Sequence, residues 1–422
     1  MYHKIVLPNG VRVVTDPISH LHTASVGIWV GNGSRFEPAE VGGISHFIEH
    51  MIFKGTEKRS AKHIAIAFDA LGGQVNAFTT KEFTCYYMKV LDEKLQTGVS
   101  ILADMFMNSL FRQEDIDMER GVVLEEIDMY EDSPEDVATE KLFESCFADS
   151  ALGRPILGAE ETLSSMTGDA LHQYMRDYYR PKDTIIAISG RFTQTDLDYI
   201  CNLFSSMTGE GRNVITPAVY HPSVTTRTKE IEQNHIAIGF PGLCVSSPDR
   251  YAYQIMNAII GGGMSSRLFQ SVREQNGLCY SIYSYTASHT ETGMFSIYTA
   301  LNQPLETKAI DLILQELARF RDEGPSRDEL SRCREQLKTT LLMSLESTSA
   351  RMNHIGRSEM VYSRVIPPEE IVERYNAVTE KDVQRVAQQI LRFEDASLCA
   401  VGECQPPDFY RELLQKIFFE KS

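Results

Sequence analysis

The hydrophobic pattern alternates between strand-like and helix-like segments, and the order of these segments is the same in both halves of the chain. Continuous or alternating apolar runs predict strands at 5–15, 24–30, 74–79, 83–91, 184–190, 230–240, 279–288, 292–300 and 397–401. A spacing of 3.6 residues predicts helices at 43–53, 61–71, 93–110, 113–130, 193–206, 248–259, 265–275, 305–323, 326–347, 368–376 and 379–392. Each half therefore reads as strand, helix, strand pair, helices and a final strand.

This shared order predicts two similar α+β domains, each with a mainly antiparallel sheet packed against helices. We expect the first domain at 1–209, a linker at 210–228 and the second domain at 229–422. A chain of 422 residues is also too long for a single ordinary core. The halves show no strong sequence repeat, so the interpretation is a duplicated domain whose copies have diverged.

The helix predicted at 43–53 has one apolar stripe and one polar face. On a helical wheel the stripe contains Ile44, Phe47, Ile48, Met51 and Ile52. The opposite face carries His46, Glu49 and His50. The helix therefore has one side for packing and another that presents two imidazoles and a carboxylate.

The polar face has the spacing of a zinc site. Two histidines at i and i+4 can bind one zinc ion, and a carboxylate between them can act as general base towards a water that the metal activates. The spacing H-x-x-E-H occurs in the inverzincin peptidases. The alternative is a solvated polar face that happens to contain two histidines.

A zinc site with two histidines needs a third protein ligand, and the helix at 113–130 offers candidates. Val123, Ile127 and Tyr130 define its packed side. Glu126 and Glu119 border that side, whereas Glu125 points away from it. We therefore expect Glu126 to be the third metal ligand. Glu119 could be a carboxylate that hydrogen-bonds to one of the metal-binding side chains. The alternative is an ordinary charged helix edge.

Composition narrows the classes of protein. The net charge of −17 argues against a nucleic-acid partner; it suits a cationic substrate, or serves only solubility. The eight cysteines are scattered without C-x-x-C, which is typical of reduced thiols in a cytoplasm. We find neither the apolar core of a signal peptide at the start nor an apolar run long enough to cross a membrane.

The second half contains the glycine run Gly261-Gly262-Gly263, followed by Met264-Ser265-Ser266-Arg267-Leu268-Phe269. A glycine run can form a loop that binds phosphate groups. No G-K-[ST] follows, so we reject a phosphate-binding loop here.

Taken together, these residues resemble the pitrilysin-type zinc peptidases, or inverzincins, over essentially the whole chain. This family includes insulin-degrading enzyme and mitochondrial processing peptidase, of which the chain would be a bacterial homologue. Residues 46–50 match the zinc motif, residues 119–123 match the segment around the distant glutamate ligand, and residues 261–269 match a motif of the second half. The glycine-rich insertion of the processing peptidase α-subunit is missing.

The resemblance implies a role for each matching residue. His46, His50 and Glu126 would bind one zinc ion per chain, Glu49 would be the general base, and Glu119 matches the second acidic position. Residues 73–79 match an edge strand, in which Asn76 and Ala77 would bind substrate backbone. Arg273 and Tyr280 match residues of the non-catalytic half that reach the substrate carbonyl, where a cation and a phenol can stabilise an oxyanion.

The implied function is zinc-dependent endopeptidase activity on unfolded or short peptides inside a closed chamber. The family forms clamshells, and a chain of this length would be one half of a homodimer. We then expect Arg273 and Tyr280 to act on the zinc site of the partner. The sequence leaves open whether the enzyme is a processing peptidase or an oligopeptidase, and whether cobalt or manganese replaces zinc. A non-catalytic scaffold, like the respiratory-complex core subunits that resemble this family, is the alternative.

Overall fold

A computed structural model describes residues 2–419 of the chain, with side chains up to residue 416. The chain divides into two compact units. Unit 1 comprises Met1–Ile127, Arg154–Thr216 and Leu342–Ile366, and unit 2 comprises Asp128–Gly153, Pro217–Leu341 and Pro367–Ser422. Both units are discontinuous in sequence, whereas the sequence analysis assigned the contiguous ranges 1–209 and 229–422. The functional roles given to those ranges stay a prediction.

Unit 1 contains a six-stranded sheet in the order β1-β2-β6-β3-β5-β4. Its strands are β1 (His3–Val6), β2 (Arg12–Pro17), β3 (Thr23–Val30), β4 (Gln74–Thr79), β5 (Thr84–Leu91) and β6 (Thr184–Gly190). All neighbours pair antiparallel except β2 and β6, which are parallel. β4 ends the order, so one of its edges has no partner strand in this sheet.

Unit 2 contains a five-stranded sheet in the order β7-β11-β8-β10-β9. Its strands are β7 (Val224–Thr228), β8 (Asn234–Pro241), β9 (Ser281–Ser288), β10 (Gly293–Leu301) and β11 (Ser397–Gly402). The parallel pair is β7 with β11, and the other pairs are antiparallel. If β1 is left out, the two sheets share one strand order. Counted along the chain within each sheet, the strands lie side by side as first, last, second, fourth and third. The predicted fold class, two similar α+β domains with mainly antiparallel sheets, is confirmed.

Helices cover both faces of each sheet. Those of unit 1 are α1 (Ile44–Met51), α2 (Ala61–Leu71), α3 (Leu95–Asn108), the first part of α4 (Gln113–Asp132), α6 (Glu160–Ser164), α7 (Gly168–Tyr178), α8 (Gln194–Phe204) and α12 (Thr348–Tyr362). Those of unit 2 are α5 (Pro134–Cys146), α9 (Arg250–Gly261), α10 (Glu306–Glu323), most of α11 (Arg327–Ser344), α13 (Pro368–Ala377), α14 (Glu380–Ile390) and α15 (Pro407–Phe419).

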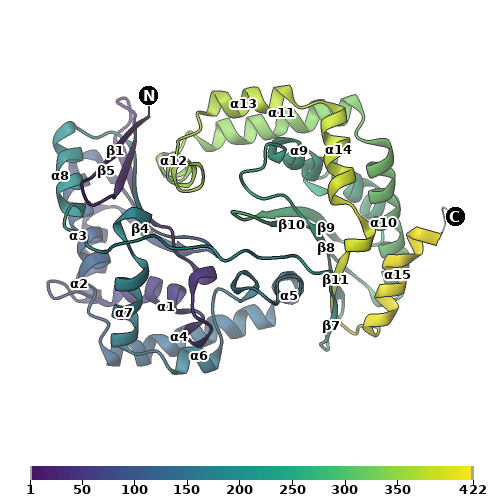
Figure 1. Ribbon diagram of the computed structural model, residues 1–422, viewed down its shortest axis with the longest axis horizontal. Coiled ribbons are helices and arrows are strands. Elements are labelled where there is room, and N and C mark those ends of the chain that lie inside the picture. The colour runs from purple at the N-terminus through teal and green to yellow at the C-terminus, as the bar shows by residue number, and fades with distance from the viewer. Residues whose placement is uncertain (1, 420–422) are drawn as a thin grey trace. The chain divides into compact units, whose positions relative to one another are not determined.

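Each unit receives one helix from the opposite half of the chain. α12, yellow-green in Figure 1, packs Met352 and Ile355 against Trp29, Ile185 and other side chains of the first sheet. The approach is close because Gly356 has no side chain: a Cβ atom there would lie 2.4 Å from Trp29 Nε1. In unit 2, α5 packs on the second sheet in the same way. This exchange makes the two units discontinuous.

Some predicted elements differ from those observed. Residues 224–228, predicted as part of a linker, form β7, which needs β11 far along the chain as its partner. α12 and α15 were not predicted. α12 begins at Thr348, directly after the helix predicted at 326–347, so no boundary separated the two in the sequence. Tyr130, predicted on the packed side of α4, is 44% exposed, since α4 crosses into unit 2 at Asp128 and no longer faces the core of unit 1.

Candidate metal centre

α1 is the short helix that the sequence pattern placed at 43–53. Its apolar side chains, Ile44, Phe47, Ile48 and Met51, are all at most 1% exposed and belong to the core of unit 1. His46 is 7% exposed, and Glu49 and His50 are half-buried on the other face. Packing of the apolar stripe therefore fixes the direction in which the polar face points.

The start of α1 is held by Glu37, a buried carboxylate. The N–H groups of Gly43 and Ser45 donate to its two oxygens at 2.7 and 2.9 Å. A negative group at a helix N-terminus satisfies free N–H groups and interacts favourably with the helix dipole. Burial raises the pKa of Glu37 to about 7, although these backbone hydrogen bonds oppose the shift.

Gly43 permits the turn that leads into α1. Its φ of +91° lies in the left-handed region, and a Cβ atom there would lie 2.6 Å from the carbonyl oxygen of Leu157. The position therefore excludes side chains both by conformation and by space.

The structure brings His46, His50 and Glu126 together. Their potential ligand atoms all lie within 4.8 Å of one another. Glu126 Oε2 lies 3.6 Å from Nε2 of His46 and 3.6 Å from Nε2 of His50. Ligands about 2.0–2.1 Å from a tetrahedral zinc ion lie about 3.3–3.4 Å apart. Two imidazoles and one carboxylate at this spacing fit a zinc ion.

The neutral state of His46 and the orientation of His50 also fit a metal site. Burial, followed by the charge of His50, lowers the pKa of His46 to about 4, so His46 is neutral at pH 7. His50 Nδ1 lies 2.9 Å from Glu119 Oε1. Because an ionised carboxylate only accepts, Nδ1 donates its hydrogen to Glu119, and Nε2 is the nitrogen that faces Glu126. A metal ion would bind at Nε2 in place of a proton.

Glu119 is itself fixed by a cation. Its second oxygen pairs with the Nζ of Lys54, in the 3₁₀ turn Ile52–Lys54 that follows α1. Burial alone would raise the pKa of Glu119, but the hydrogen bonds from His50 and Lys54 leave it below its usual range. Burial would also lower the pKa of His50, but Glu119, Glu126 and Glu49 together raise it. Glu119 therefore contacts His50 at Nδ1, the ring nitrogen that does not face Glu126.

Glu49 lies beside His50 on α1 and is held from the sheet. The Thr79 hydroxyl at the end of β4 donates to Glu49 Oε2 at 2.5 Å. Burial raises the pKa of Glu49, with the hydrogen bond from Thr79 acting in the opposite direction. A carboxylate with a raised pKa next to a candidate metal site has the properties of a proton acceptor.

Of the two neighbouring glutamates, Glu126 lies in the cluster, whereas Glu125 is exposed and lies outside it; the role of Glu126 as a ligand stays a prediction. Asn76 and Ala77 lie on β4, the predicted edge strand, where the N–H of Ala77 donates to the Asn76 side chain at 2.8 Å. Sequence analysis missed the roles of Glu37, Lys54 and Thr79. Lys54 carries a signal, because it lies one helical turn after His50. Glu37 and Thr79 carry none, since their partners are set by the fold.

Arg273 and Tyr280 lie in unit 2 and contact each other. The Arg273 guanidinium carbon lies 4.7 Å from the centre of the Tyr280 ring and 4.6 Å from that of Phe269. Tyr280 is 77% exposed. Arg273 belongs to a π-helical segment, Phe269–Gln275, a distortion that occurs often at functional sites. The structure thus presents a half-buried cation beside an exposed phenol.

The motif at 261–269 has a packing role that its sequence did not reveal. A Cβ atom at Gly261 would lie 2.4 Å from the backbone nitrogen of Ser284. Arg267 binds both oxygens of Glu329, at 2.7 and 2.8 Å, and also reaches the carbonyl oxygen of Gly324. These contacts join the start of the π-helical segment to α11.

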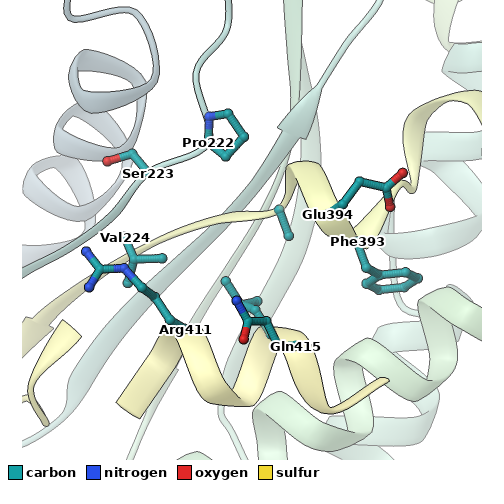
Figure 2. A pocket seen from close by; sticks show the side chains of 9 residues that line it. Pro222, Ser223, Val224, Phe393, Glu394, Arg411 and Gln415 are labelled. Atoms are coloured by element: carbon teal, nitrogen blue, oxygen red, sulfur yellow. The ribbon is translucent and has the colours of Figure 1, made fainter. Parts of the chain in front are cut away.

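Unit 2 contains a pocket whose lining includes none of the predicted site residues. It has a volume of about 530 Å³ and is lined by the start of β7, the 3₁₀ turn Phe393–Asp395 and α15. Figure 2 shows Arg411 and Gln415 from α15 with Phe393 and Glu394 across from them. With one carboxylate and no histidine in its lining, it has no ligand set for a metal.

Within residues 2–419, no helix combines the length and hydropathy needed to cross a membrane.

Known proteins of similar sequence cover nearly the whole chain. Residues 12–160 match the family described as Insulinase (Peptidase family M16), and residues 165–337 match the Peptidase M16 inactive domain. A Bacillus subtilis protein named as an uncharacterized zinc protease is 41% identical, covering 95% of this chain and 98% of the relative. A Streptomyces coelicolor protein with the same description is 37% identical, covering 92% and 87%.

Two crystal structures share the fold. One, described as a peptidase M16 inactive domain from Pseudomonas fluorescens, has a TM-score of 0.90 at 18% identity and covers 96% of this chain and 98% of its own. The other, a protease from Helicobacter pylori, has a TM-score of 0.87 at 19% identity, with coverage of 95% and 99%. The family matches and the identity to the curated relatives confirm the resemblance to pitrilysin-type peptidases: this chain belongs to peptidase family M16.

Proposed function

We propose that the chain is a zinc metalloendopeptidase that hydrolyses unfolded or short peptides. The observation that carries the proposal is the grouping of His46, His50 and Glu126 within 4.8 Å, beside the half-buried Glu49. The names of the Bacillus and Streptomyces relatives, zinc proteases, support the same activity.

Each residue then has a defined task. His46 Nε2, His50 Nε2 and Glu126 would hold one zinc ion per chain, and Glu119 orients His50. A bound zinc ion supplies Lewis acidity, which lowers the pKa of water and polarises a carbonyl group. Glu49 accepts the proton of the attacking water and delivers it to the leaving amine. Its raised pKa suits both transfers, because the group must take up and release a proton in one cycle.

The peptide would bind as an added strand along β4, through Asn76 and Ala77. A free sheet edge binds extended backbone by main-chain hydrogen bonds, which do not depend on the substrate's side chains. The Ala77 N–H donates to the Asn76 side chain in the structure, so this hydrogen bond must break before the N–H can donate to the peptide. Broad specificity for unfolded chains follows from this mode of binding.

Arg273 and Tyr280 would stabilise the oxyanion that forms as water adds to the carbonyl. We further propose that the chain forms a homodimeric clamshell, in which this pair serves the zinc site of the partner. The exposure of Tyr280 supports a role towards another molecule. A cytoplasmic location is also part of the proposal, supported by eight cysteines that are free thiols in the structure.

A mixed dimer tests this arrangement. One chain carries Glu49→Gln and the other Arg273→Ala, so only trans action leaves one complete site. We expect activity well above that of either parent homodimer. Activity no higher than that of the parents contradicts action across the interface.

The first test of the function is hydrolysis of a quenched fluorescent peptide with several Arg or Lys residues. Activity should disappear on chelation and return when zinc is restored, and product masses should show internal cleavage. A zinc-loaded protein that leaves a panel of unfolded peptides uncut contradicts the peptidase. Absence of both bound zinc and activity favours the non-catalytic scaffold.

A further inference from the structure

The hydrogen bond between Thr79 and Glu49 links the edge strand to the proposed base. Residues 75, 77 and 79 of β4 share one face, because side chains alternate along a strand. Val75 and Ala77 pack into the core that also contains the apolar side of α1. The Thr79 side chain therefore points towards α1, where its hydroxyl lies 2.5 Å from Glu49 Oε2.

The bond has the length of a charge-assisted O–H···O⁻ hydrogen bond, the stronger kind. Thr79 reaches only one of the two carboxylate oxygens. Between residues 2 and 416, no side-chain hydrogen bond or ion pair to Glu49 Oε1 is found. The two oxygens of Glu49 are therefore not equivalent.

Two other buried polar groups feel the charge of Glu49, but in the described part of the chain neither forms a hydrogen bond with it. Burial, and after it the charge of Glu49, raises the pKa of the Cys85 thiol. The Tyr86 hydroxyl forms a hydrogen bond of 2.9 Å with that of Tyr179. Among the described side chains, Thr79 is thus the hydroxyl that sets the orientation of the carboxylate.

We propose that Thr79 is a positioning residue: it holds Glu49 Oε2 so that Oε1 is the oxygen that takes the proton from water. Thr79 lies on the same strand as Asn76 and Ala77, three and two residues away. A peptide added along β4 is therefore in fixed register with the residue that orients the base. This inference rests on the proposed function, because it gives Glu49 the role of general base.

Two variants separate the hydroxyl from the shape of the side chain. Thr79→Val keeps the branched shape and removes the donor, whereas Thr79→Ser keeps the donor. In the zinc-loaded enzyme we expect Thr79→Val to lower kcat about 10- to 100-fold, with KM within about twofold of the parent, because a misdirected base slows proton transfer but not binding. Thr79→Ser should stay within a few-fold of the parent.

Zinc affinity gives a first readout besides activity. Thr79 touches none of the proposed ligands, so Thr79→Val should bind zinc as tightly as the parent. If Val and Ser lower kcat equally, or if Val raises KM and leaves kcat unchanged, Thr79 is only a strand contact and the inference is wrong.

A double-mutant cycle on the metal-free protein gives a second readout. Thr79→Val should lower the midpoint of urea unfolding in the parent but shift it much less in a Glu49→Ala background, because the partner is already gone. Equal shifts in both backgrounds overturn the contact itself. If the protein shows this coupling but cleaves no peptide, the contact between Thr79 and Glu49 is supported and the peptidase function is contradicted. Failure of the inference is therefore distinguishable from failure of the proposed function.

Discussion

His50 and Glu119 form a hydrogen bond of 2.9 Å between Nδ1 and Oε1, on the side of the imidazole opposite the candidate metal position. Because Glu119 also pairs with Lys54, it stays ionised and accepts the Nδ1 proton. The Nε2 atom of His50 is thereby directed at the space shared with Glu126, 3.6 Å away. A residue that would not touch the metal thus decides which nitrogen can bind it.

Glu119→Ala should weaken zinc binding about 10- to 100-fold, the usual cost of removing a carboxylate that orients a ligating histidine. Competition with a chromophoric zinc chelator measures the affinity. Glu125→Ala is the matched control, because Glu125 lies on the same helix but is exposed and outside the cluster. Similar affinities for the two variants contradict the orienting role.

Glu49→Gln should retain zinc and lose turnover by about two to four orders of magnitude, because an amide of the same shape cannot accept the proton. Single-turnover cleavage of a fluorescent peptide measures the rate, and metal analysis verifies that zinc is bound. Turnover equal to that of the parent removes Glu49 from the role of general base.

Gly43→Ala should destabilise unit 1 by about 1–3 kcal/mol, because φ is +91° and the new Cβ atom would meet the Leu157 carbonyl oxygen at 2.6 Å. Urea unfolding followed by circular dichroism measures the change. Gly121→Ala is the control: Gly121 lies within α4, and a Cβ atom there meets nothing within 4 Å. Alanine is the better helix former, so this variant should be neutral or more stable. A Gly43→Ala protein as stable as Gly121→Ala shows that the turn tolerates a side chain.

The Arg267–Glu329 pair should make unit 2 sensitive to acid. Burial would raise the pKa of Glu329, but hydrogen bonds from Arg267 and the Ser326 N–H lower it to about 2. In the unfolded chain a glutamate has a pKa of about 4.3. The folded state therefore gains stability that is fully present above about pH 4.3 and is lost as the pH falls towards 2; discounted for solvent screening, this is about 2 kcal/mol.

Comparison of the parent with Glu329→Gln isolates this contribution. The difference in unfolding free energy should be largest near neutral pH and should shrink progressively between about pH 4.3 and 2. Urea unfolding at several pH values measures it. A difference that stays constant down to pH 3 shows that the ion pair does not carry the acid sensitivity.

Sequence alone predicted the local parts of the centre. The i, i+4 spacing of His46 and His50 and the apolar stripe of α1 are properties of one short helix, so a helical wheel places them. The same reasoning separated Glu126 from Glu125, because one residue of rotation moves a side chain from the packed side to solvent. The duplicated α+β architecture could be predicted from the order of the elements. The family could be predicted from motifs that are contiguous in the sequence.

Only the tertiary structure decided which distant residues complete these parts. Thr79 reaches Glu49 because β4 and α1 pack together, and Glu37 caps α1 from an adjoining turn. The exchange of α5 and α12 between the units depends on complementary faces, such as Gly356 against Trp29, which no local pattern specifies. Spacing along the chain fixes which groups share a face of one element; the packing of that element against others fixes which groups they meet.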